Sequence, residues 1–195
     1  MMDGEKRERD QKIRELIAQE IEDGASLAAE ARKMVGYLLV EKKGYAKEDI
    51  RTGVAFEVKL GDETAWSKLD FVVLVDGKPG MIVKCAAGSL DSRQRQVVAA
   101  ARVVASPPVP IAVVADPTTA LVLDVASGKV AGEDFGAIPV RDQLRTLVAG
   151  MKLPPLSPER VEKEKRILLA FDAIQCHVPK GKDGGVRIGP EDCKS

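Results

Sequence analysis

Two charged residues stand out because they lie inside apolar segments of the chain. Asp70 falls in the stretch LDFVVLV and Lys84 in the stretch MIVKC, with a turn-forming DGKPG between them. A carboxylate in an apolar strand is costly to bury unless it is paired or bound to a ligand. We therefore interpret Asp70 and Lys84 as neighbours across a β-hairpin.

The length of the hairpin loop decides whether the two side chains share a face of the sheet. With a two-residue loop, Asp70 would pair with Val83 and lie on the face opposite to Lys84. With a three-residue loop over 76–78, Asp70 would pair with Lys84. The Pro79-Gly80 sequence is compatible with such an irregular loop.

The surrounding pattern predicts an α/β fold with a mixed central sheet flanked by helices. Short apolar runs bounded by Gly, Pro and Asp predict strands, and apolar residues at helical spacing predict helices. The expected strands are 54–60, 69–75, 81–85, 111–115 and 120–125, and the expected helices are 27–41, 91–105, 140–151 and one that Ser157 opens. Ser26 is the expected N-cap of the helix at 27–41.

With 195 residues, the chain is long enough for one good core with terminal extensions. We divide it into an N-terminal amphipathic helix over 1–25, a central domain over 26–152, a C-terminal helix over 153–178 and a mobile tail over 179–195. Gly24 is expected to end the first helix, whose apolar stripe includes Ile13, Leu16 and Ile17.

Composition narrows the environment and the partners. Thirty basic and thirty acidic residues give zero net charge, so a nucleic-acid partner would require a local basic patch. Three scattered cysteines do not form the disulfide framework of a small secreted protein, and no apolar run is long enough to cross a membrane. We expect a cytoplasmic protein with no membrane partner.

From about residue 29 to 123 the chain resembles the N-terminal nuclease-like domain of type I restriction enzyme R subunits, in the PD-(D/E)XK superfamily. The resemblance is carried by Glu30 and Arg32 on a helix, Gly44-Tyr45 after it, and then KEDI, LDFVVLVDGKP and IVK in that order. It implies a restriction-endonuclease-like fold. It also implies that Asp70 is a candidate Mg²⁺ ligand and Lys84 a candidate catalytic lysine.

The chain departs from the family at the Glu of the Glu-x-Lys motif, where it has Ile82. Ile82 offers no oxygen, so Mg²⁺ affinity should fall sharply unless Glu30 or Glu57 supplies the missing carboxylate. Glu57-Val58-Lys59 also fits Glu-x-Lys. This tripeptide precedes Asp70, however, whereas the family motif follows the Asp by one hairpin. We therefore expect Glu57-Val58-Lys59 on a solvent-facing strand surface.

Other candidates have simpler interpretations beside the functional ones. Gln94 stands where some relatives place a Gln near the active site, but it also suits an exposed helix face. Cys85 is expected to be a buried structural cysteine. Three arginines of the helix at 91–105 can contact phosphates or simply be solvated (Arg93, Arg95 and Arg102). The C-terminal cysteines and histidine match no zinc-site spacing (Cys176, His177 and Cys193).

Three hypotheses for function follow. The first is a restriction-endonuclease-like domain with a degenerate active site, retained to bind DNA or a protein partner. The second is an active Mg²⁺-dependent DNA endonuclease with a relocated carboxylate. The third is a scaffold without nucleic-acid affinity that forms a homodimer through its N-terminal helix.

Overall fold

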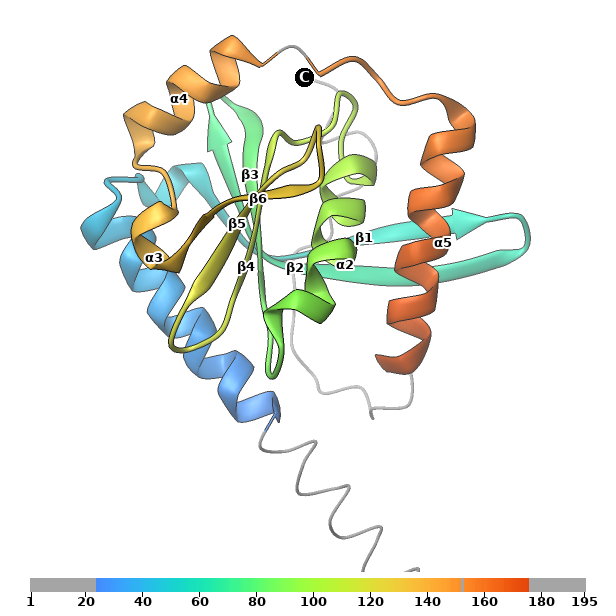
Figure 1. Ribbon diagram of the computed structural model, residues 1–195, viewed down its shortest axis with the longest axis horizontal. Coiled ribbons are helices and arrows are strands. Elements are labelled where there is room, and N and C mark those ends of the chain that lie inside the picture. Colours follow the sequence, from blue (N-terminus) through green and yellow to red (C-terminus); the bar gives the residue numbers. More distant parts are fainter. Residues whose placement is uncertain (1–23, 152, 176–195) are drawn as a thin grey trace, which may run out of the picture.

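The computed structural model describes residues 24–151 and 153–175. Its six strands form one sheet in the order of the sequence, antiparallel except for the parallel pair β3 and β4. The strands are β1 (Ile50–Leu60), β2 (Glu63–Val75), β3 (Lys78–Cys85), β4 (Ile111–Ala115), β5 (Ala120–Asp124) and β6 (Lys129–Glu133). The mixed sheet of the predicted α/β class is confirmed (Figure 1).

Helices cover both faces of this sheet. A first helix over residues 24–37 continues into the π-helical turn η1 (Leu38–Lys42), and the short 3₁₀ turn η2 (Lys47–Asp49) leads into β1. The remaining helices are α2 (Leu90–Val103), α3 (Asp134–Ala137), α4 (Arg141–Gly150) and α5 (Pro158–Gln175). No described helix is long and apolar enough to cross a membrane.

Two apolar cores lie on opposite faces of the sheet. One joins α2 and α5 to alternate strand residues such as Val72, Ile82 and Val114. The other joins the first helix, α3 and α4 to the strand residues at the intervening positions, such as Val73 and Val83. Strands β2, β3 and β4 are therefore apolar on both faces, as the run LDFVVLV predicts.

Several predicted boundaries are wrong. The first three strands begin four, six and three residues earlier than expected, at Ile50, Glu63 and Lys78. β6 and α3 were not predicted. Residues 24–26 are already helical, so Ser26 lies inside the first helix and does not cap it. The predicted helix before Gly24 and the predicted tail after residue 178 lie outside the described residues.

The β2–β3 hairpin turns on two residues, so the three-residue loop is wrong. Asp76 and Gly77 both have positive φ, 50° and 79°, as a type I′ turn requires, and Val75 pairs with Lys78. Gly80 then forms a bulge. Pro79 pairs with Leu74 and Met81 with Val73, which leaves Gly80 as one extra residue in β3.

The bulge shifts the register by one residue relative to a regular two-residue hairpin, in which Asp70 would be opposite Val83. Beyond it, Ile82 pairs with Val72 and Val83 with Phe71. The next step of this register brings Lys84 level with Asp70. The two candidate residues line one cavity, although the three-residue turn proposed to bring them together is wrong.

The outer parts of β1 and β2 form an arm that leaves the main sheet and runs behind α5 (Figure 1). Leu69 belongs to the core beneath α5, whereas Phe71, two residues later, belongs to the core on the other face. The ribbon therefore turns over at Asp70. Gly53 in β1, between the partners of Leu69 and Phe71, has φ of 62°, a conformation that glycine adopts without strain.

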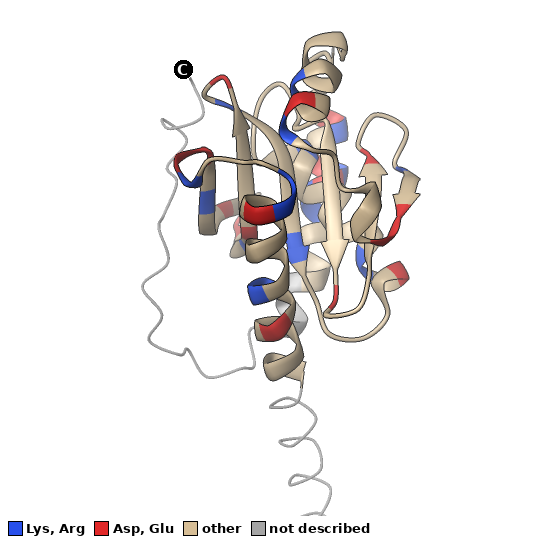
Figure 2. Ribbon diagram, turned by 90° about the vertical axis from the view of Figure 1, so that its left-hand side faces the viewer, with Lys and Arg blue, Asp and Glu red and all other residues tan. Residues whose placement is uncertain are grey.

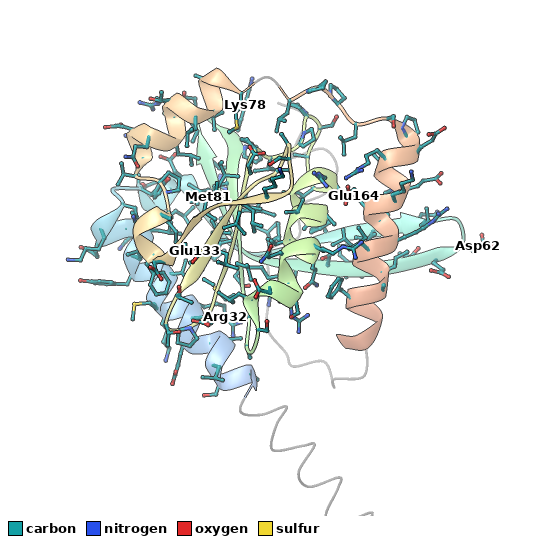
Figure 3. The ribbon with its side chains drawn as sticks, viewed as in Figure 1. Arg32, Asp62, Lys78, Met81, Glu133 and Glu164 are labelled. Atoms are coloured by element: carbon teal, nitrogen blue, oxygen red, sulfur yellow. The ribbon has the colours of Figure 1, made fainter. Side chains whose placement is uncertain are left out.

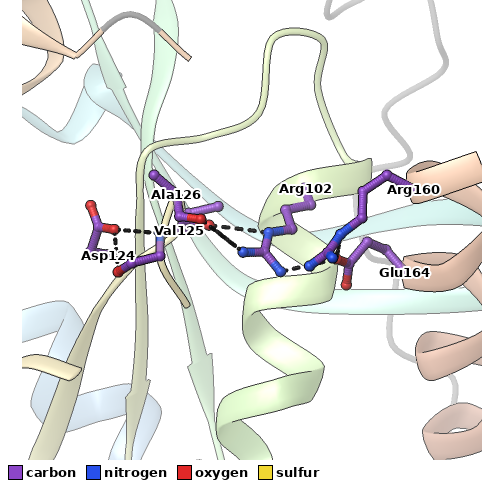
Figure 4. Close-up of polar contacts among 7 residues, drawn as sticks. Arg102, Asp124, Val125, Ala126, Arg160 and Glu164 are labelled. Atoms are coloured by element: carbon purple, nitrogen blue, oxygen red, sulfur yellow. Dashed lines mark hydrogen bonds and ion pairs between the residues drawn. The ribbon is translucent and has the colours of Figure 1, made fainter. Parts of the chain in front are cut away.

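A buried ion-pair cluster fixes α5 to the rest of the fold (Figures 3 and 4). Glu164 is 2% exposed and accepts hydrogen bonds from Arg102 at 2.9 Å and Arg160 at 2.7 Å. Arg102 also donates to the main-chain oxygen of Val125. Arg102, which we considered as a phosphate ligand, thus lies inside a structural cluster.

Candidate functional site

A cavity of about 350 Å³ lies where the first helix, the end of β3 and the start of α2 meet at Asp70. Asp70, in β2, is the acidic residue of its lining. Four basic side chains from four elements share the lining with it. Its residues are Gly24, Ala28, Arg32, Lys68, Asp70, Lys84, Cys85, Ala86, Ala87 and Arg93.

Asp70 is held by donors from two elements. Its carboxylate is 7% exposed, and Oδ2 accepts a hydrogen bond of 2.6 Å from the main-chain N–H of Cys85. Oδ1 lies 3.4 Å from Nη1 of Arg32, on the first helix. The buried charge is thus compensated by a cation and a main-chain donor, as a buried carboxylate requires.

Lys84 lies at the same cavity, and its position is defined by the neighbouring strand. Its Nζ donates a hydrogen bond of 2.9 Å to the main-chain oxygen of Lys68 in β2. Lys68 itself is exposed, and Arg93 on α2 reaches Gln96 Oε1 at 3.4 Å. With Arg32, these side chains give the described part of the lining four positive charges against one negative charge.

Ile82, at the position where the resemblance implies a Glu, does not line the cavity. Its side chain is 0% exposed and packs in the core under α2 and α5, between Val72 of β2 and Ala112 of β4. Apolar packing has therefore taken the place of a polar contact. No oxygen from this position reaches Asp70.

The other carboxylates proposed as replacements lie elsewhere. Glu30 is exposed on the first helix, and Glu57 is exposed on β1 opposite Trp66. Neither belongs to the cavity lining. Gln94, also outside the lining, donates from Nε2 to Asp91 Oδ1 at 2.6 Å within α2. The structure thus brings together Asp70 and Lys84, but not Glu30 or Gln94.

Among residues 24–151 and 153–175, no group of three or more His, Cys, Asp or Glu side chains is placed to hold a metal ion. Asp70 is the one carboxylate that this part of the chain offers at the cavity. Cys176, His177 and Cys193 lie outside the described residues.

Cys85 is a buried structural thiol, as predicted. It is 6% exposed, its main chain holds Asp70, and its side chain packs in the core beside the first helix. Burial, with a smaller contribution from the Asp70 carboxylate, raises the pKa of the Cys85 thiol to about 12. The nucleophilic thiolate is therefore a negligible species at neutral pH.

Lys68 was not predicted as a site residue. In a regular strand it would lie on the same face as Asp70, so its spacing of two residues was an available signal. What the spacing does not show is the turning over of the ribbon at Asp70. That change of face places Lys68 at the edge of the cavity and on the exposed surface of the arm.

A larger cavity, of about 660 Å³, lies between β4, β5, β6, α3 and α4, on the face of the sheet that the first helix also covers. Its lining is mostly apolar and includes Ile111, Val122 and Leu147, with Asp124 and Asp142 as its charged residues. Among the described residues, its lining includes neither a cation nor any residue of the Asp70 cavity. The smaller cavity is therefore the better candidate for polar chemistry.

Comparison with known proteins agrees with the resemblance noted from the motifs. Residues 29–139 match the family described as type I restriction enzyme R protein N terminus (HSDR_N). No curated protein and no solved structure matches the chain. The matched segment spans more than half of the sequence and runs from the first helix through β6 to the loop after α3. The chain belongs to the family of type I restriction enzyme R protein N-terminal domains.

Proposed function

We propose that this domain binds the phosphodiester backbone of a nucleic acid at the Asp70 cavity and does not cleave it. The observation that carries the proposal is the charge of the lining, where the described residues place four cations around one carboxylate that is already bonded to Arg32. The chain as a whole has zero net charge, so this concentration of positive charge is local. Figure 2 shows that basic and acidic residues are otherwise mixed, for example along the first helix.

The side-chain chemistry of the lining suits phosphate. A guanidinium carries five N–H donors and an ammonium three, and neither accepts hydrogen bonds. Arg32, Lys68, Lys84 and Arg93 come from the first helix, β2, β3 and α2, so they surround the cavity from several directions. Phosphate contacts of this kind give affinity without reading the base sequence.

The same lining does not suit Mg²⁺. This ion needs nearly octahedral oxygen coordination, and its protein sites use one or two carboxylates with water and substrate phosphates. Here Asp70 is the single carboxylate, its two oxygens accept from Arg32 and Cys85, and the other charged neighbours are cations that repel a metal ion. We infer that the family's metal-dependent chemistry is lost at this site.

Binding is tested by fluorescence anisotropy with labelled single- and double-stranded DNA at several salt concentrations. We expect the variant Lys68→Gln/Arg93→Gln to bind more weakly and to lower the slope of log K against log salt by about 2, one for each lost phosphate contact. A matched control, Lys129→Gln/Lys163→Gln, removes two exposed cations of β6 and α5. Equal losses in both variants would show nonspecific charge attraction and contradict the proposal.

Cleavage is tested in parallel with Mg²⁺ and Mn²⁺. An active nuclease with a relocated carboxylate is the second candidate, because Asp70 and Lys84 do lie at one cavity. We expect intact substrate with the wild-type protein. Metal-dependent cleavage that disappears in the isosteric variant Asp70→Asn would establish the nuclease and refute the binding-only proposal.

A further inference from the structure

Trp66, the single tryptophan of the chain, is 54% exposed. It lies in β2 on the arm, opposite Glu57 of β1. A large aromatic side chain usually contributes to a core or an interface, because burying it removes a large apolar area from water. Its exposure on a strand surface therefore calls for a functional explanation.

The arm has one covered face and one open face. Val54, Phe56 and Val58 of β1 are buried in the core beneath α5. The alternate residues point away from that core, and they are exposed at Glu57 and Lys59. Trp66, opposite Glu57, is on this open face.

The open face leads directly to the Asp70 cavity. Lys68 lies two residues after Trp66, is exposed, and lines the cavity. Residues i and i+2 of a strand share a face and are about 7 Å apart. Lys68 thus connects the cavity to the strand face that carries Trp66, while Glu57, opposite Trp66, disfavours a phosphate on the β1 side of the ring.

We propose that Trp66 stacks on an unpaired base of a single-stranded nucleic acid whose phosphate is bound by Lys68 and the cavity. An exposed aromatic beside a positive groove is the arrangement by which proteins hold single strands, since every base has a π-face. In a duplex the bases are stacked on one another and cannot cover the ring without unstacking. This proposal rests on the phosphate binding proposed above and specifies the kind of polynucleotide.

The single tryptophan permits a direct test with the full-length protein. Trp66 emission is recorded during titration with oligothymidylate of about 15 nucleotides, within the range that single-strand binding sites cover. The same titration is made with oligouridylate, with an abasic phosphodiester of equal length and with a duplex. We expect both single strands to quench Trp66 emission, with DNA and RNA differing only in the extent of quenching. We expect the abasic chain and the duplex to change the emission little.

Affinity is measured independently by anisotropy of the labelled strand. We expect Trp66→Ala to weaken binding about 5- to 150-fold and Trp66→Phe to retain most of the affinity. Trp66→Ala should also remove the preference for oligothymidylate over the abasic chain. Because the ring is on an open face, both variants should fold, which circular dichroism checks.

The outcomes separate the two proposals. If the wild-type protein binds the strand through the cavity but Trp66 emission is unchanged and Trp66→Ala binds equally well, stacking is refuted and phosphate binding stands. Duplex binding as tight as single-strand binding, with equal quenching, also refutes the preference for single strands. If no polynucleotide binds at all, the proposed function fails and the stacking proposal fails with it.

Discussion

Restoring the motif carboxylate with Ile82→Glu should destabilise the domain and should not create a metal site. Ile82 is fully buried between Val72 and Ala112 and does not line the cavity. Removing a buried Ile side chain costs about 1.5–3 kcal/mol of hydrophobic stabilisation. An uncompensated buried charge costs about 3–5 kcal/mol more. We therefore expect the free energy of unfolding to fall by at least about 4 kcal/mol.

Thermal and urea denaturation measure this loss. For a domain of this size each kcal/mol lowers Tm by about 2–4 °C, so the shift should be at least roughly 8 °C. Ile82→Val, which stays apolar, should cost only about 0.5–1.5 kcal/mol. Ile82→Gln has the shape of Glu without its charge, so the difference between the Gln and Glu variants isolates the buried charge.

The reasoning is refuted if Ile82→Glu is as stable as Ile82→Val. That result would mean that a carboxylate at this position escapes the core and reaches the cations of the cavity. Titration calorimetry with Mn²⁺ on the same variant would then show whether it also completes a metal site with Asp70.

Three further predictions concern stability. Glu164→Gln should lower the free energy of unfolding by about 3 kcal/mol, as measured by urea denaturation, because Arg102 would keep a buried charge without its carboxylate. A change near zero would show that the cluster does not hold α5. Tyr45→Phe should cost about 1 kcal/mol, since the buried hydroxyl donates 2.9 Å to the main-chain oxygen of Pro139; unchanged urea denaturation would contradict this. The Cys85 thiol has its pKa raised from 9.0 to about 12, so unfolding releases its proton above about pH 9 and the free energy of unfolding should fall from there to about pH 12. Cys85→Ala should make this alkaline decline shallower, and an unchanged pH profile would refute the assignment.

The sequence predicted the central part of the fold well because its strands are short, apolar and bounded by turn residues. β4 and β5 begin where expected, and α4 differs from its predicted bounds by one residue at each end. β6 was missed because Lys129–Glu133 carries little apolar signal: four of its five residues are exposed at the edge of the sheet. The segment forms a strand through its antiparallel pairing with β5.

The candidate site was predictable where chemistry alone suffices. A carboxylate in an apolar strand had to be compensated, and Asp70 is compensated by Arg32 and by the main-chain N–H of Cys85. The contribution of Lys68 depends on the turning over of the ribbon at Gly53. The two-residue spacing suggests that Lys68 shares a face with Asp70, but the change of face at Gly53 cannot be read from the pattern of β2 alone.

The bulge at Gly80 separates the spacing of Asp70 and Lys84 along the chain from their arrangement in space. A Cβ at this position would lie 3.0 Å from Val75 and 3.1 Å from Val148, so the bulge depends on the missing side chain. Deleting Gly80 would leave a regular two-residue hairpin that still places Lys84 level with Asp70. The number of residues between the two can thus differ by one while their arrangement in space is kept. A pattern that fixes this spacing would overlook proteins that build the same pair with or without the extra glycine.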